Sequence, residues 1–230
     1  MNAVPTHARS LPPSLVALLL PASITLVSIT LAACTLAACS PDGSGPSSEP
    51  DGANGAPAGI ELEQYRGDGF SLLLPVSWTI VTPEDLDFAT LFADAGDFAG
   101  SAALEQQVGA AFTQGGKLFA IDFSTAASGF VTSLSLIALP LPALTAAEVE
   151  AVTVQQLEDL LQVAEVSSEI RSLPAGEAVV VQYRVPGSGS RGIGVTLLTV
   201  DRQWVITLSG LDLDPLEDAF GSMIESFREA

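Results

Sequence analysis

The side chains best suited to nucleophilic or acid–base chemistry are few in this chain and lie near its start. Both cysteines, Cys34 and Cys39, end a Leu-Ala-Ala-Cys tetrapeptide, and no cysteine follows them. The single histidine, His7, precedes them. The chain beyond Cys39 therefore contains no thiol nucleophile, no disulfide and no imidazole, so neither Ser-His-Asp nor Cys-His catalysis is available there.

Two further patterns could bind or activate a substrate. A Ser-Lys pair would have to use Lys117, the only lysine, which has no motif around it. The segment from Gly187 to Gly192 spells Gly-x-Gly-x-x-Gly, which binds dinucleotides only between a strand and a helix. Here a second strand is predicted to follow, so a hairpin loop is the favoured interpretation.

Carboxylates are abundant, but their spacing is not that of a calcium loop. The pairs Asp85 and Asp87, Asp94 and Asp97, and Asp212 and Asp214 lack the accompanying glycine and terminal glutamate. Paired acids facing one another across a cleft, as glycoside hydrolysis needs, cannot be recognised from sequence. We therefore predict no enzymatic activity, no catalytic residues, no cofactor and no metal site, with a carboxylate-dependent hydrolase as the least favoured class.

Charge and length narrow the class of protein further. From Cys39 onward seven Arg or Lys stand against 27 Asp or Glu, a net charge of about −20. Such a surface repels phosphate backbones, so nucleic-acid binding is excluded. It also disfavours docking of the domain itself on anionic headgroups. A chain of 230 residues accommodates one ordinary domain with extensions.

The N-terminal segment has the order of an export signal. A weakly basic start is followed by the uncharged stretch Ser14 to Leu31, which ends in small residues. Its length also suits a membrane-spanning helix, the less favoured alternative because Pro21 interrupts it. From Ser40 to Ala58 the chain is rich in Pro, Gly and Ser and is predicted to be a disordered linker.

The doubled Leu-Ala-Ala-Cys sequence resembles the lipobox of bacterial lipoproteins. That resemblance implies cleavage before a cysteine, which then carries lipid such as palmitate and becomes the new N-terminus. Cys34 lies nearer the last charge of the leader, whereas Cys39 directly precedes the linker and is slightly favoured. The predicted divisions are a signal peptide at 1–38, the lipidated cysteine with its linker at 39–58, and a domain at 59–230.

The domain is predicted to be of the α+β class. Alternating apolar residues predict strands at 61–65, 69–74, 78–81, 117–124, 130–139, 165–172, 177–185, 193–200 and 203–209. Helices are predicted from Thr82-Pro83, over 101–114, from a capping box of Thr145 and Glu148 to Ala164, and after an Asp214 cap. Short connections imply a mostly antiparallel sheet covered by helices.

Three short motifs carry a second resemblance. The segment Tyr65 to Pro75 with Trp78, the segment Gly129 to Ser133, and the sequence Ser226-Phe227-Arg228 resemble the PsbP-like family. The closest type is the actinobacterial LpqN-like lipoprotein, and the paucity of lysine fits that origin. The resemblance implies an α/β/α sandwich with a binding or accessory role and no shared catalytic residues.

These expectations combine into one hypothesis. The chain is predicted to be a non-enzymatic accessory lipoprotein on the extracytoplasmic face of the cell membrane, where its domain binds an envelope protein. The alternative is a carrier of an apolar lipid or small molecule in a pocket between sheet and helices. Such a pocket would be lined by phenylalanines: Phe88, Phe92, Phe112, Phe119 and Phe123.

Overall fold

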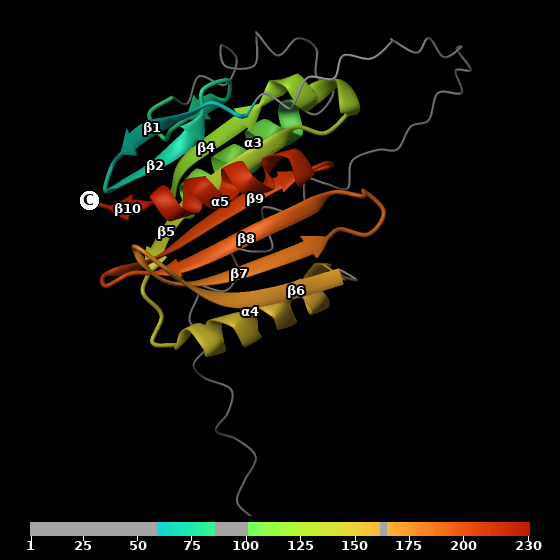
Figure 1. Cartoon of the computed structure of the whole chain (residues 1–230). Coiled ribbons are helices and arrows are strands. Elements are labelled where there is room, and N and C mark those ends of the chain that lie inside the picture. Colours follow the sequence, from blue (N-terminus) through green and yellow to red (C-terminus); the bar gives the residue numbers. More distant parts are fainter. Residues whose placement is uncertain (1–58, 86–100, 162–164) are drawn as a thin grey trace, which may run out of the picture.

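Two antiparallel sheets form the body of the protein (Figure 1), in a computed structural model that describes residues 59–85, 101–161 and 165–230. The large sheet has the order β3-β4-β5-β9-β8-β7-β6 and the small one the order β1-β2-β10. The strands are β1 (Leu62–Gly67), β2 (Phe70–Pro75), β3 (Thr79–Val81), β4 (Gly116–Asp122), β5 (Thr132–Pro140), β6 (Glu165–Leu173), β7 (Gly176–Arg184), β8 (Arg191–Leu198), β9 (Arg202–Gly210) and β10 (Arg228–Glu229). The helices are α3 (Ser101–Thr113), α4 (Ala146–Leu161) and α5 (Glu217–Ser226), with 3-10 turns η3 (Phe123–Ser128) and η4 (Asp214–Leu216).

Every strand pairing in the described parts of the chain is antiparallel, which confirms the predicted α+β class. One expectation needs correction, because β1 and β2 do not join the large sheet. They form a separate small sheet with β10, a strand that the sequence did not indicate. The reason is that Phe70, Leu72 and Leu74 on β2 are all buried in the main core, so β2 packs face to face against the large sheet.

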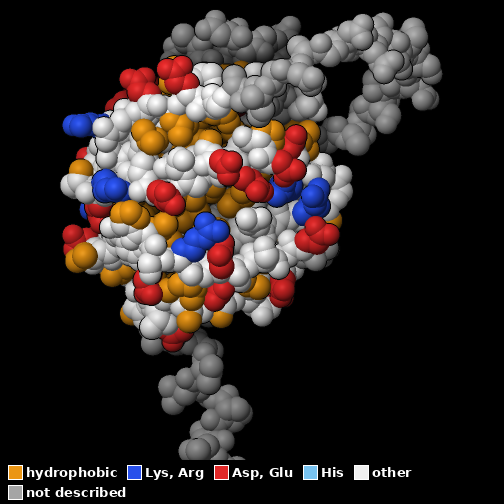
Figure 2. All heavy atoms as spheres, viewed as in Figure 1, with side chains coloured by type: hydrophobic (Ala, Val, Ile, Leu, Met, Phe, Trp, Pro, Cys, Tyr) orange, Lys and Arg blue, Asp and Glu red, His pale blue; other side chains and the backbone are white. Residues whose placement is uncertain are grey.

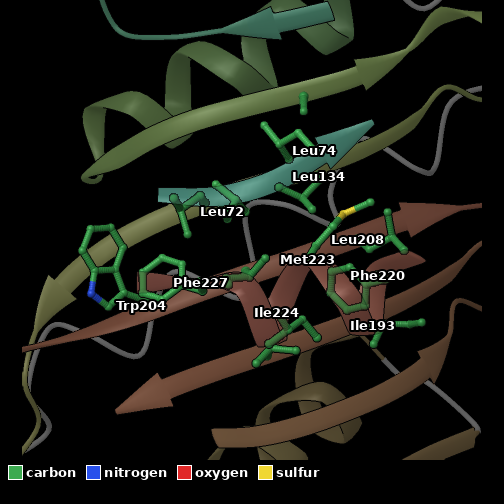
Figure 3. Packing of buried hydrophobic residues seen from close by; sticks show 14 of the residues in the cluster. Leu72, Leu74, Leu134, Ile193, Trp204, Leu208, Phe220, Met223, Ile224 and Phe227 are labelled. Carbon is green, nitrogen blue, oxygen red and sulfur yellow. The ribbon is translucent and has the colours of Figure 1, made fainter. Parts of the chain in front are cut away.

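Helix α5 and the small sheet cover one face of the large sheet (Figure 1). Figure 3 shows Phe220, Met223 and Ile224 of α5 directed at the sheet residues beneath the helix. Phe227 follows the helix and lies 5.1 Å from Trp204 between ring centroids. Tilted aromatic pairs of this kind add roughly 0.5–1.5 kcal/mol to the burial of the rings. This aromatic group therefore fixes the C-terminal segment to β9.

On the opposite face, the described helices pack near the two ends of the sheet. Helix α3 packs over β3 and β4 through a cluster that contains Leu104, Val108 and Phe119. Helix α4 packs over β6 and β7 through a second cluster that contains Val149 and Leu157. The middle strands β5, β9 and β8 lie between these clusters, and of their side chains on this face Leu198 on β8 packs against the α4 cluster.

Local signals fix where two of the helices begin and end. At the start of α4 the Glu148 carboxylate accepts hydrogen bonds from the Thr145 amide and hydroxyl, each at 2.8 Å, which confirms the capping box. After α3 the chain reverses at Gly115, whose φ is 97°. The first carbon of a side chain there would also lie 2.7 Å from the Ala138 carbonyl oxygen. Glycine is therefore required both by the positive φ and by the close approach of this carbonyl.

The predicted cap of the last helix is wrong. Asp214 belongs to the 3-10 turn η4, and α5 begins after Leu216 without a side-chain cap. The Asp214 carboxylate instead pairs with the Arg191 guanidinium on β8. The Arg191 guanidinium carries a full positive charge whereas the amides at a helix start carry partial charges, so the carboxylate is attracted more strongly to the arginine.

Two predicted segments lie outside the described residues. They are the leader with its linker, residues 1–58, and the helix expected after Thr82-Pro83, from residue 86 onward. The described end of the second segment shows one local contact, in which the Asp85 carboxylate accepts from the Thr82 hydroxyl at 2.8 Å.

Candidate functional site

The middle strands of the large sheet present a row of hydroxyl groups on the face that carries α3 and α4. Register pairs Ser133 with Ser209 and Ser135 with Thr207 across β5 and β9. Because directly opposed residues of an antiparallel pair share a face, these four side chains project together. Thr196 on β8 lies on the same face. We call these five residues the hydroxyl strip.

Hydrophobic clusters border the hydroxyl strip on both sides. Ser135 is opposite Phe119, which is buried beneath α3. On the other side Thr207 is opposite Gly194, and Gly194 is opposite Val181 beneath α4. The three strands that carry the strip span about 10 Å, which is the width of one extended chain with its side chains.

Two glycines on β8 show where space exists above the strip. A side-chain carbon at Gly192 would lie 2.2 Å from the Tyr183 ring, so that ring occupies the surface there. At Gly194 the same carbon would meet only the Val181 carbonyl oxygen, at 3.9 Å. The sheet surface is thus filled above Gly192 and open above Gly194.

The Ser135 hydroxyl marks the strip as an incomplete polar site. Ser135 is 2% exposed, and within the described residues its Oγ has no hydrogen-bond partner. A buried hydroxyl without a partner costs roughly 1–3 kcal/mol, which is why such groups are rare in folded proteins. A ligand group that donates to or accepts from this oxygen would recover that free energy.

A second concavity lies on the opposite face of the sheet, beside α5. Its volume is about 370 Å³. Its polar lining combines one arginine with several acids and polar groups: Arg171, Gln182, Glu217, Asp218, Ser222 and Glu225. No lining side chain is a buried polar group without a partner in the described parts of the chain, so this cleft lacks the signal that Ser135 provides.

Most of the basic side chains in the described parts of the chain are paired with acidic ones. Figure 2 shows acidic and basic groups interspersed over the face that carries α5. Arg191 contacts Asp214 and also Glu217, the latter at 3.0 Å. The hydrogen bond to Asp214 is the main cause that raises the pKa of Arg191. These pairs tie η4 and α5 to β8 and have a structural role.

Of the candidate residues identified in the sequence, Cys34 and Cys39 lie outside the described residues. Lys117 binds Asp68 at 2.8 Å, and this bond lowers the pKa of the Asp68 carboxyl. The Gly187 to Gly192 segment joins β7 to β8, which pair antiparallel, so the hairpin interpretation is confirmed.

The described members of the three aspartate pairs, Asp85, Asp212 and Asp214, make local or structural contacts. The Asp212 carboxylate accepts from the Asp214 amide at 3.2 Å, a contact within the turn. Among the described residues no group of three His, Cys, Asp or Glu side chains could hold a metal ion. Asp87, Asp94 and Asp97 lie outside those residues.

The predicted aromatic pocket is placed only in part. Phe119 is 1% exposed within the cluster beneath α3, and Phe112 and Phe123 pack against that cluster. These three phenylalanines therefore serve as core. Phe88 and Phe92 lie outside the described residues.

Sequence reasoning missed the hydroxyl strip. The alternation of Ser133 and Ser135 with Leu134 and Leu136 is typical of a strand with one solvated face, since a polar face normally meets water. No local signal distinguishes this alternation from that of a strand with one solvated face. Only the register shows that the polar residues of β5, β9 and β8 meet.

Among known proteins, similarity is found to solved structures. No family model matches the chain, and no curated protein matches it. The chain is similar to the solution structure of cyanobacterial PsbP (CyanoP) from Synechocystis sp. PCC 6803. The match has 16% identity and a TM-score of 0.47, and it covers 78% of this chain and 98% of that one.

None of the described helices combines the length and the apolar character that crossing a bilayer requires.

Proposed function

We propose that the protein is a non-enzymatic binding module held at the extracytoplasmic face of a membrane by a lipid on Cys39 or Cys34. The tandem Leu-Ala-Ala-Cys sequence supports the anchor. The linker of 40–58 then gives the domain freedom to reach a partner in the cell envelope. The buried, unpartnered Ser135 hydroxyl is the observation that carries the binding role.

The hydroxyl strip is the proposed contact site, in which Thr207 and Ser209 are partly exposed whereas Ser133, Ser135 and Thr196 are buried. Its groups are neutral and each can donate and accept, so it suits uncharged hydrogen-bonding groups such as backbone amides. The open surface above Gly194 admits such a group next to Thr207. The negative charge of the chain lies elsewhere, in Asp and Glu, and serves solubility.

The test is site-specific photo-cross-linking of the full chain in its own cells. A photoreactive residue in place of Thr207 is expected to capture an envelope protein, and Gly194→Leu, which fills the open surface, is expected to abolish that capture. The same photoreactive residue in place of Val200, which is 89% exposed in the β8–β9 turn, is the control and should give no product. Equal products from both positions, or capture that survives Gly194→Leu, would count against the proposal.

The alternative carrier role predicts a different result. Native mass spectrometry of the purified chain would then show a co-purified lipid that Gly194→Leu displaces. The phenylalanines Phe112, Phe119 and Phe123 give this role no support, because they pack in the core beneath α3.

A further inference from the structure

Strand β6 leaves a long free edge on the large sheet. It is the last strand in the sheet order, and nine register pairs join its inner edge to β7. No strand in the described parts of the chain pairs with its outer edge. Most of its side chains are exposed, among them Ile170 at 42%. It contains no proline and no bulge in its pairing, two of the devices that usually protect an edge.

Two side chains of opposite charge flank Ile170 on β6. Glu169 and Arg171 flank it and form a hydrogen-bonded ion pair on one face, with half of each side chain exposed. We propose that β6 is a self-complementary edge, at which two copies of this chain pair antiparallel about a two-fold axis through Ile170. In this register Glu169 of each copy is opposite Arg171 of the other.

Neighbouring registers are less favourable. A two-fold axis at Glu169 would place two carboxylates opposite one another, and an axis at Arg171 would oppose two guanidinium groups. Like charges directly opposite destabilise a strand pair, whereas opposite charges stabilise it. The register at Ile170 also places Ser168 opposite Ser172, so that residues 167–173 of the two copies pair without opposing like charges.

The position of α4 is compatible with this pairing. The helix contacts β6 and β7 to a similar extent, so it lies over the boundary between them. With strands about 4.8 Å apart, the α4 helices of the two copies would lie about 10 Å apart. That separation is the usual interaxial distance of packed helices, so the two copies meet without a clash between these elements.

Register-specific cross-linking tests the proposal in the full chain with Cys34→Ser and Cys39→Ser. Ile170→Cys should form a disulfide-linked dimer under mild oxidation, because opposed Cα atoms in an antiparallel pair lie about 4.5–5.5 Å apart. Ser168→Cys is the matched control on the same strand. Its two copies would be about 13 Å apart, so no linked dimer is expected.

Charge reversal gives an independent measurement in the same background. Glu169→Arg alone and Arg171→Glu alone should each weaken dimerisation about tenfold by sedimentation at 0.15 M salt, since each opposes like charges twice. The double variant should restore it, and thermal unfolding of each variant separates loss of the dimer from loss of the fold. Equal cross-linking at 168 and 170, no linked dimer from Ile170→Cys, or a double variant as weak as the single ones would overturn the proposal. None of these results bears on the hydroxyl strip, which lies on other strands.

Discussion

Glu148 shows how one exposed carboxylate fixes the start of a helix. Its oxygen accepts from the Thr145 amide and hydroxyl, while its own amide donates to the Thr145 hydroxyl at 3.4 Å. The bond from the Thr145 amide is the largest cause that lowers the pKa of Glu148 below its usual 4.5. The charged carboxylate is therefore the form that stabilises the folded chain.

The pH dependence of stability follows from that direction. A group whose pKa is lower in the folded state contributes stability above its unfolded pKa, and the contribution is lost as the pH falls through the folded pKa. We expect Glu148→Gln to be less stable than the unmodified chain above pH 4.5 and the two to converge in more acidic solution. Urea unfolding across this pH range measures the effect. Glu158→Gln, an exposed change on the same helix, is the control, and a Glu148→Gln difference that does not vary with pH would contradict the explanation.

At the scale of elements, the C-terminal motif joins two segments that are distant in the chain. The Ser226 hydroxyl accepts from the Leu73 amide on β2 at 2.8 Å and donates to the Met223 carbonyl at 2.7 Å. Arg228 donates to the carbonyls of Glu225 and Phe227, where helix carbonyls lack partners. The Ser-Phe-Arg sequence that prompted the family resemblance therefore has a structural purpose, the docking of α5 on the small sheet.

Ser226→Ala should consequently destabilise the domain by about 1–3 kcal/mol, because it leaves the Leu73 amide without its partner. The comparison is Ser222→Ala, an exposed position on the same helix whose hydroxyl donates to the Asp218 carbonyl at 3.1 Å. That variant should change stability by no more than about 0.5 kcal/mol. Chemical unfolding of both measures the contrast, and equal losses would show that the bond across 153 residues contributes nothing.

Most elements could be predicted because their signals are local. Thr145 with Glu148, the alternation in β7 and the glycines after α3 each act within a few residues. What could not be predicted depends on contacts between distant segments. The diversion of β2 into a second sheet follows from its packing against α5, and the capture of Asp214 follows from the position of Arg191. The hydroxyl strip likewise exists only once β5, β9 and β8 are placed in register.

At the scale of the whole molecule, the two faces of the large sheet differ in the elements that pack against them. One face carries the largest hydrophobic cluster and is closed by α5 and the small sheet (Figure 1). Among the described elements, α3 and α4 pack against the other face near its ends, and the hydroxyl groups between them include the buried Ser133, Ser135 and Thr196. The largest hydrophobic cluster therefore lies on one side of the sheet, and the proposed binding site lies on the other.

The proposed anchor belongs to the same scale, because it would decide where the whole domain works. We expect the Cys34→Ser, Cys39→Ser double variant to leave the membrane fraction and to lose incorporation of a labelled fatty acid. Each buried methylene contributes roughly 0.8 kcal/mol, and one acyl chain holds a protein only marginally, so stable retention needs the two or more chains that lipidation supplies. The single variants identify the acylated cysteine, and Ser44→Ala in the linker is the control that should keep both label and location. Continued acylation of the double variant, or an unmodified native chain recovered with Met1 from the cytosol, would remove the basis for an extracytoplasmic role.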